Sequence, residues 1–296
     1  MQESMDIKKR IAVHDGTFHA DDVFAVATLL LMYPDAEVLR TRDRSILDTA
    51  DIVVDVGDVY DEAANRFDHH QKGGAGERQS GIPYAGFGLV WKKYGERVAG
   101  SLQAANLIDA RLVAAIDGPD NGVSLIKPLF ENYLPYTMGT FVESWNPTWQ
   151  ESDETLRERF FDAVTIADRI IRREIVRAAS IVVGFSIVEK AYADAPDKRV
   201  VVLPQENLPW REIAERFPEA LYVVEPKTNQ WKLKTVQSGI FVNRKSLPAS
   251  WAGLRDEQLA DVTGVQDALF CHNKRFLVVA RTKEGILALA EKALAA

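Results

Sequence analysis

Histidine and aspartate side chains gather in two short segments near the start of the chain. Four of the five histidines lie between residues 14 and 70. Residues 14–22 read HDGTFHADD and follow the first apolar run, while residues 67–71 read FDHHQ. Between them, residues 52–57 (IVVDVG) have the pattern of a buried strand that ends on the carboxylate Asp55. Imidazole and carboxylate are ligands that divalent manganese, zinc and iron accept. The spacing therefore predicts a metal site.

The composition is that of a soluble globular protein. The chain has 296 residues, of which 47% are hydrophobic and 27% charged, enough for one large or two ordinary domains. A single cysteine, Cys271, excludes an intrachain disulfide and a thiolate zinc cluster. The net charge of −7 argues against a surface that coats nucleic acid along its whole length. We find no signal peptide in residues 1–10 and no transmembrane run, and we expect a cytoplasmic protein.

Strand and helix patterns alternate through the first half of the chain. Apolar runs predict strands at 11–14, 36–41, 52–55 and 66–69, and helices at 21–32, 87–94 and 98–116. This alternation predicts an α/β fold with a doubly wound, mostly parallel sheet. Ligands of such sheets bind beyond the carboxyl ends of the strands. His14 and Asp55 stand at two such ends, which places them in one site.

The second half reads as a helix followed by a smaller α+β domain. Apolar residues at helical spacing predict one long amphipathic helix over residues 151–179, which connects the lobes or packs a dimer. Strand patterns follow at 199–203, 221–224, 230–236, 268–272 and 276–280, with a closing helix at 284–294. We therefore expect a catalytic domain at 1–150, a connecting helix at 151–180 and a substrate-binding domain at 181–296.

Asp68-His69-His70 is the signature of the DHH superfamily of metal-dependent phosphoesterases. Further segments of the sequence resemble one branch of this superfamily, the melanocyte-proliferating-gene (MYG) exonuclease family. The resemblance rests on the following segments: GTFHADD (16–22), DVG (55–57), FDHHQ (67–71), DNG (120–122), FVNRKSLPASWAGLRDEQL (241–259) and LFCH (269–272). They span nearly the whole chain. The first motif departs from the superfamily pattern, because His19 stands where an aspartate is usual, with one extra residue before it.

The resemblance implies two divalent cations, manganese first, with magnesium, zinc or iron as alternatives. It places His14, His19 and Asp55 on one ion, and Asp21, Asp55, His69 and Asp117 on the other. Two ions of this kind need a bridging carboxylate, and Asp55 is our choice. His70 would face the substrate, and Asp68 would orient the histidine pair. Asp120 is a further ligand or supporting group.

Plainer interpretations compete at three of these aspartates. Asp22 can replace Asp21 if the register is off by one, or it can be a charge favoured by the start of the helix. Asp117 and Asp120 precede Gly118 and Asn121-Gly122, so ordinary turns are an alternative. We favour Asp117 over Asp120 as the ligand.

The resemblance also implies substrate contacts in the second domain. Arg244, Lys245 and His272 match positions that would bind substrate across a cleft, and the planar guanidinium of arginine suits phosphate. The implied activity is that of a 3′–5′ exonuclease on RNA or short oligonucleotides. The oligomeric state is left open, with a homodimer as one alternative. One alternative is a small-phosphate hydrolase on the same two-metal site, acting on pyrophosphate, a cyclic dinucleotide or a nucleotide. The other is a non-catalytic metal-binding protein.

Overall fold

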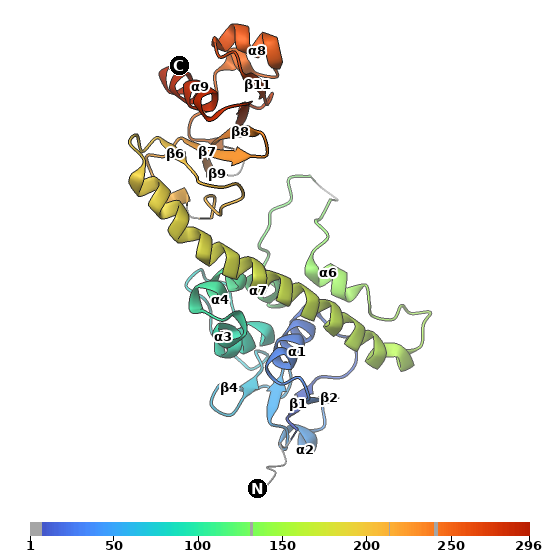
Figure 1. The fold of residues 1–296 in the computed structure, drawn as a ribbon. Helices are drawn as coiled ribbons and strands as arrows, with labels where there is room; N and C mark the ends of the chain where they lie inside the picture. The colour runs from blue at the N-terminus through green and yellow to red at the C-terminus, as the bar shows by residue number, and fades with distance from the viewer. Residues whose placement is uncertain (1–7, 131–132, 213, 240–241) are drawn as a thin grey trace. The chain divides into compact units, whose positions relative to one another are not determined.

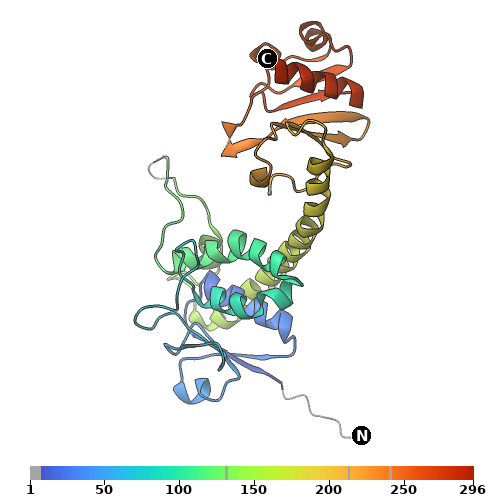
Figure 2. The ribbon, with the colours of Figure 1, turned by 90° about the vertical axis from the view of Figure 1, so that its left-hand side faces the viewer.

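The computed structural model describes residues 8–130, 133–212, 214–239 and 242–296. The chain divides into two compact units, Met1–Ala179 and Ser180–Ala296. Each unit has its own sheet and its own helices (Figures 1 and 2).

The first unit is built on a five-stranded sheet of order β2-β1-β3-β5-β4. Its strands are β1 (Arg10–Val13), β2 (Glu37–Arg40), β3 (Ile52–Val54), β4 (Tyr60–Asp61) and β5 (Arg66–Phe67). All neighbouring pairs are parallel except β4 with β5, which is antiparallel. The two central strands β1 and β3 are apolar at almost every position because both of their faces are covered.

Helices cover both faces of this sheet. On one face α1 (Ala20–Met32) and α3 (Gly86–Ala99) lie side by side, and both contact β3. On the other face α2 (Arg44–Leu47) contributes Leu47 to a small apolar cluster with Ala12 and Val53. Successive strand residues point to opposite faces, so β1 supplies apolar side chains to both layers.

Further helices of the first unit pack against α1 and α3. They are α4 (Leu102–Ile108), one π-helical turn (Asp109–Val113), α5 (Ala114–Asp120) and α6 (Met138–Glu143), followed by a 3₁₀ turn (Asp153–Thr155). The long helix α7 (Leu156–Asp194) buries Phe160, Val164, Ala167 and Ile171 at helical spacing in the first unit. The boundary between the units falls inside α7.

The second unit has a five-stranded sheet of order β11-β12-β8-β7-β6. Its strands are β6 (Val200–Val202), β7 (Tyr222–Lys227), β8 (Gln230–Thr235), β11 (Ala268–Cys271) and β12 (Leu277–Ala280). The unit also contains the helices α8 (Asp256–Thr263) and α9 (Lys283–Ala295) and a small ribbon of β9 (Gln237–Gly239) and β10 (Val242–Asn243). Two 3₁₀ turns lie at Ala214–Arg216 and Ala249–Trp251. Only β6 pairs in parallel with its neighbour. The helix α9 packs on β7, β8 and β12. The sheet and α9 enclose one core, and a second cluster joins the sheet to the end of α7.

The predicted fold class is confirmed: a mostly parallel α/β unit is followed by a smaller α+β unit. The predicted helix at 151–179 begins five residues later and continues to Asp194. The sequence patterns did not predict α2, α6, α8 or the β9–β10 ribbon.

Two predictions involve residues outside the described ranges. The search for a signal peptide depends mostly on residues 1–7, and the motif at 241–259 begins on residue 241. Among the described residues, none of the helices is long and apolar enough to cross a membrane.

Candidate metal centre

The carboxyl ends of three parallel strands place the histidines and aspartates at one edge of the first sheet. His14 follows β1, Asp55 follows β3, and Asp68 begins the run after β5. Because the strand order is β1-β3-β5, these ends are neighbours. Asp55 has a φ of +53°, a left-handed conformation that is uncommon outside glycine, asparagine and aspartate. Such backbone conformations are frequent at functional sites.

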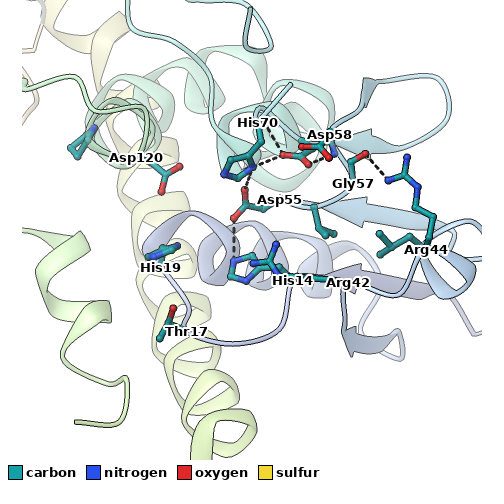
Figure 3. Close-up of a pocket in the computed structure, with 14 residues that line it drawn as sticks. His14, Thr17, His19, Arg42, Arg44, Asp55, Gly57, Asp58, His70 and Asp120 are labelled. Carbon is teal, nitrogen blue, oxygen red and sulfur yellow. Dashed lines mark hydrogen bonds and ion pairs between the residues drawn. The ribbon is translucent and has the colours of Figure 1, made fainter. Parts of the chain in front are cut away.

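Asp55 lies at the centre of this group (Figure 3). One carboxylate oxygen is 3.3 Å from His14 Nε2. The other is 3.4 Å from His69 Nε2 and 3.5 Å from His70 Nδ1. His69 Nε2 also lies 3.1 Å from a carboxylate oxygen of Asp120. One carboxylate thus faces three imidazoles, as a shared ligand must.

Hydrogen bonds from Nδ1 determine which ring nitrogen of His14 and of His69 faces the site. His14 Nδ1 donates to the carbonyl oxygen of Asp15 at 2.9 Å. His69 Nδ1 donates to the side-chain oxygen of Asn121 at 3.1 Å, and the amide group of Asn121 in turn donates to the Asp117 carbonyl oxygen. With Nδ1 occupied in both rings, Nε2 is the atom left to bind a cation, the usual arrangement for a metal-binding histidine.

The start of α3 holds the third aspartate of the group. The backbone N–H of Phe87 donates to one oxygen of Asp21 at 2.7 Å. This approach requires glycine at position 86, because a Cβ there would lie 2.7 Å from the other Asp21 oxygen. The unpaired amides and the dipole of a helix N-terminus favour a carboxylate at this place. Asp21 is consequently fixed with one oxygen free.

Four buried atoms at this edge have no hydrogen-bond partner among the described residues. They are an oxygen each of Asp21, Asp22 and Asp55, together with His69 Nε2. Two sets of possible ligand atoms lie within 4.8 Å of one another: Asp55, His69 and His70 form one set, and Asp21, His69 and Asp120 the other. Buried polar atoms without partners are costly, and a divalent cation would satisfy them. The residues therefore fit a metal centre.

The charge of the site favours a cation as well. Burial raises the pKa of Asp21 well above its ordinary value, and repulsion from Asp120 and Asp55 raises it further. Burial would lower the pKa of His69, but contacts with Asp120 and Asp55 outweigh it and raise the pKa to about 11. The clustered carboxylates thus favour positive charge at this place, which a metal ion would supply.

These residues open into a pocket of about 630 Å³ in the first unit. Its lining includes His14, His19, Asp55, His70 and Asp120 (Figure 3). A second pocket of about 230 Å³ adjoins it, because both are lined by His19, Pro119 and Asp120. The candidate centre is therefore buried on its sheet side and open on the other.

Comparison with known proteins identifies the family. The family model MYG1_exonuc, described as an uncharacterised protein family (UPF0160), matches residues 10–294. A MYG1 exonuclease of Homo sapiens is 32% identical, over 97% of this chain and 86% of its own length. The chain belongs to the MYG1 exonuclease family.

Other relatives lie at similar distance. A MYG1 protein of Schizosaccharomyces pombe is 30% identical over 96% of this chain and 97% of its own length. Among solved structures, RecJ of Thermus thermophilus in complex with Mn²⁺ covers 97% of this chain and 52% of the RecJ chain, with 14% identity and a TM-score of 0.31. MYG1 membership supports assignment as a hydrolase of the nuclease or phosphoesterase class.

The structure places Asp120, rather than Asp117, against His69. We expected Asp117 as the ligand, but its two carboxylate oxygens are engaged elsewhere. One accepts from the guanidinium of Arg78 at 2.8 Å and the other from the N–H of Gly88 at 3.0 Å. Asp120 instead points its carboxylate at His69. In this MYG1 chain the aspartate that fits the centre is therefore Asp120.

Matched substitutions separate the two aspartates. We expect Asp120→Asn to weaken metal binding by at least about 100-fold, since even supporting groups around a metal cost 10- to 100-fold when removed. Asp117→Asn should chiefly destabilise the fold, by about 2 kcal/mol, because it removes one of the two carboxylates that accept hydrogen bonds from the buried Arg78 guanidinium. Metal titration and thermal unfolding of both variants measure this difference. Equal loss of metal affinity in both would return Asp117 to the ligand set.

The remaining predicted residues of the first unit lie around the same pocket. Asp22 is buried with one oxygen 3.1 Å from His14 Nε2, and its other oxygen accepts from the N–H of His19. The imidazole of His19 is exposed, with its ring centroid 6.0 Å from that of His14. Asp68 accepts from the backbone N–H groups of Asp58 and His70. Their individual roles stay predictions.

The predicted substrate residues of the second unit have structural contacts of their own. The guanidinium of Arg244 donates to the carbonyl oxygens of Ala214 and Ala220, at 3.1 and 3.0 Å, and also to that of Phe217. The ammonium of Lys245 donates to the Leu294 carbonyl at 2.8 Å. His272 Nδ1 accepts from the Lys274 N–H at 3.0 Å. Their part in binding substrate stays a prediction.

The sequence analysis missed several supporting residues. Asn121 was known only as part of the DNG segment, although it orients His69. Asn146 holds the loop between β1 and α1, because its side chain accepts from the Phe18 N–H at 3.0 Å and donates to the Phe18 carbonyl at 2.8 Å. A lone asparagine 128 residues away in sequence gives no signal of such a contact.

Proposed function

We propose that this protein is a divalent-metal-dependent phosphodiester hydrolase, a 3′–5′ exonuclease on RNA or short oligonucleotides. The observation that carries the proposal is the convergence of unpartnered atoms of Asp21, Asp55 and His69, beside an open pocket that Asp55 lines. Resemblance to the MYG family supplies the substrate class and the direction of cleavage. The human relative's name, MYG1 exonuclease, supports an exonuclease activity.

Two cations would be held by residues of the first unit. His14, His19 and Asp55 would hold one, and Asp21, Asp55, His69 and Asp120 the other, with manganese as the first candidate. When bound, such a pair lowers the pKa of a water nucleophile and compensates charge on the phosphoryl oxygens. Asp55 would be the ligand that both ions share, because its two carboxylate oxygens face different histidines.

His70 and Asp68 would handle the proton of the leaving oxygen. His70 Nδ1 lies 2.7 Å from a carboxylate oxygen of Asp68, so Nδ1 carries a proton and donates a hydrogen bond to that carboxylate. With the ring protonated on both nitrogens, Nε2 would give its proton to the leaving oxygen, which leaves a neutral imidazole. The His70 side chain is 56% exposed and lines the pocket, as a group that meets substrate must be.

The test is cleavage by the purified full chain with manganese and with a chelator. Single-stranded RNA labelled at its 5′ end should be shortened from the 3′ end in the presence of manganese and should stay intact with the chelator. Pyrophosphate and bis(p-nitrophenyl) phosphate are assayed beside it. Hydrolysis of pyrophosphate without RNA would establish the small-phosphate alternative. A protein that binds manganese and cleaves none of the three is a metal-binding protein without this activity.

The homodimer and the cytoplasmic location expected from the sequence remain part of the proposal. Size-exclusion chromatography with light scattering tests the first, and localisation of the tagged protein tests the second.

A further inference from the structure

The pocket of the candidate centre has a basic side that no metal needs. Its lining contains Arg42 and Arg44 as well as the histidines and aspartates. In Figure 3, Arg44 lies at the end of the pocket away from Asp120, with Asp55 between them. Arginine is a poor metal ligand but a strong ligand for phosphate.

The sheet topology explains why these arginines stand beside the metal ligands. Arg42 follows the end of β2 by two residues, and Arg44 begins α2. Since β2 pairs in parallel with β1, its carboxyl end lies at the same edge as His14. The row of functional groups along this edge thus continues from Asp55 and His14 to Arg42.

Both arginines line the pocket and keep free N–H groups. The Arg42 side chain is 64% exposed, and its Nε forms an ion pair with the exposed carboxylate of Asp15 at 3.3 Å. Arg44 donates one N–H to the Gly57 carbonyl at 2.8 Å, which anchors it at the pocket wall. By contrast, Arg40 is fixed by the Gly16 carbonyl and the Phe160 ring, and Arg78 by two carboxylates.

We infer that Arg42, together with Arg44, binds a second phosphate of the substrate, next to the phosphate that is cleaved. The inference rests on the proposed function. The scissile phosphate belongs at Asp55, where the cations would balance its charge. A guanidinium with free N–H groups further along the same pocket then fits the neighbouring phosphate of the same strand, through charge-assisted hydrogen bonds.

This subsite defines the substrate class more narrowly. A compound with one phosphodiester and no other phosphate would fill the metal side and leave Arg42 without a partner. A dinucleotide with an additional terminal phosphate, or any longer oligonucleotide, would fill both sides. The pocket therefore favours substrates with at least two phosphates.

The experiment compares substrates with one phosphate and with two phosphates. With the manganese-loaded full chain, Arg42→Ala should raise KM by about 10- to 100-fold for a trinucleoside diphosphate or a terminally phosphorylated dinucleotide, as expected for loss of hydrogen bonds to a charged group. For the dinucleoside monophosphate, KM should stay unchanged, and kcat should stay unchanged for both. Lys72→Ala is the matched control, because Lys72 is an exposed cation near His70 that does not line the pocket.

A binding measurement gives a readout besides turnover. Calorimetry of the wild-type protein should show tighter binding of a nucleoside 3′,5′-bisphosphate than of the 5′-monophosphate, and Arg42→Ala should abolish the difference. Equal KM changes for the one- and two-phosphate substrates, or no change for either, would overturn the inference. If the wild type cleaves neither RNA nor a dinucleotide, the proposed function fails, and the calorimetric comparison by itself decides the phosphate subsite.

Discussion

Asp55→Asn is expected to lower manganese-dependent hydrolysis by more than about 1,000-fold and to prevent the chain from holding both ions, because several kcal/mol of metal-derived stabilisation are lost together. Asp55 faces His14, His69 and His70 within 3.5 Å, so it is the one carboxylate that both ions would share. Asparagine keeps the size of the side chain and tolerates the left-handed backbone at this position, so the fold should persist. Metal content after dialysis and initial rates measure the two effects.

Asp58→Asn provides a closely matched control. Asp58 lines the same pocket and has a left-handed φ of +56°, but its carboxylate is exposed and contacts none of the three imidazoles. Its contribution to the site is the backbone N–H that donates to Asp68, which asparagine retains. We expect wild-type metal content in this variant. An Asp55→Asn protein that also keeps two ions at wild-type affinity would show that Asp55 bridges nothing.

The strand ends of the first unit could be predicted because buried parallel strands have a simple pattern. Residues 11–13 of β1 and 52–54 of β3 are all apolar, and the first polar residues after them, His14 and Asp55, must leave the sheet at its carboxyl edge. The same reasoning predicted that these two residues meet. It could not predict that β2 places Arg42 in the same row, because the loop after β2 carries no motif.

The choice between Asp117 and Asp120 depends on contacts that sequence does not show. Both residues lie in α5, three positions apart, so they lie near the same face of the helix. The carboxylate of Asp117 accepts hydrogen bonds from Arg78 and from the N–H of Gly88. Position 88 requires glycine, because a Cβ there would lie 1.8 Å from that carboxylate. These partners come from segments 29 and 39 residues away, which leaves Asp120 to face His69.

The second unit shows the same limit. Arg244 was singled out because a guanidinium suits phosphate, yet its N–H groups already bind backbone carbonyls at the end of a 3₁₀ segment. Sequence indicates which side chains are chemically able to bind an anion. It does not indicate which of them the fold has already used.

His70→Ala is expected to keep both metal ions and to lose turnover on RNA by about 100- to 10,000-fold, the range of general acid–base catalysis. His69 is the buried member of the pair, 5% exposed and placed between Asp55 and Asp120, so His69→Ala should instead lose metal. His70 is 56% exposed and is oriented by Asp68, which suits a group that meets substrate.

The leaving group distinguishes a proton donor from a ligand at His70. An RNA 3′ or 5′ oxygen leaves as a strong base and needs a proton, whereas p-nitrophenolate leaves without one. If His70 supplies that proton, His70→Ala should reduce cleavage of bis(p-nitrophenyl) phosphate far less than cleavage of RNA, at unchanged metal content. Equal losses on both substrates, accompanied by loss of metal, would make His70 the ligand and leave His69 as the candidate for proton transfer, because Asp55 contacts both rings and either could complete the centre.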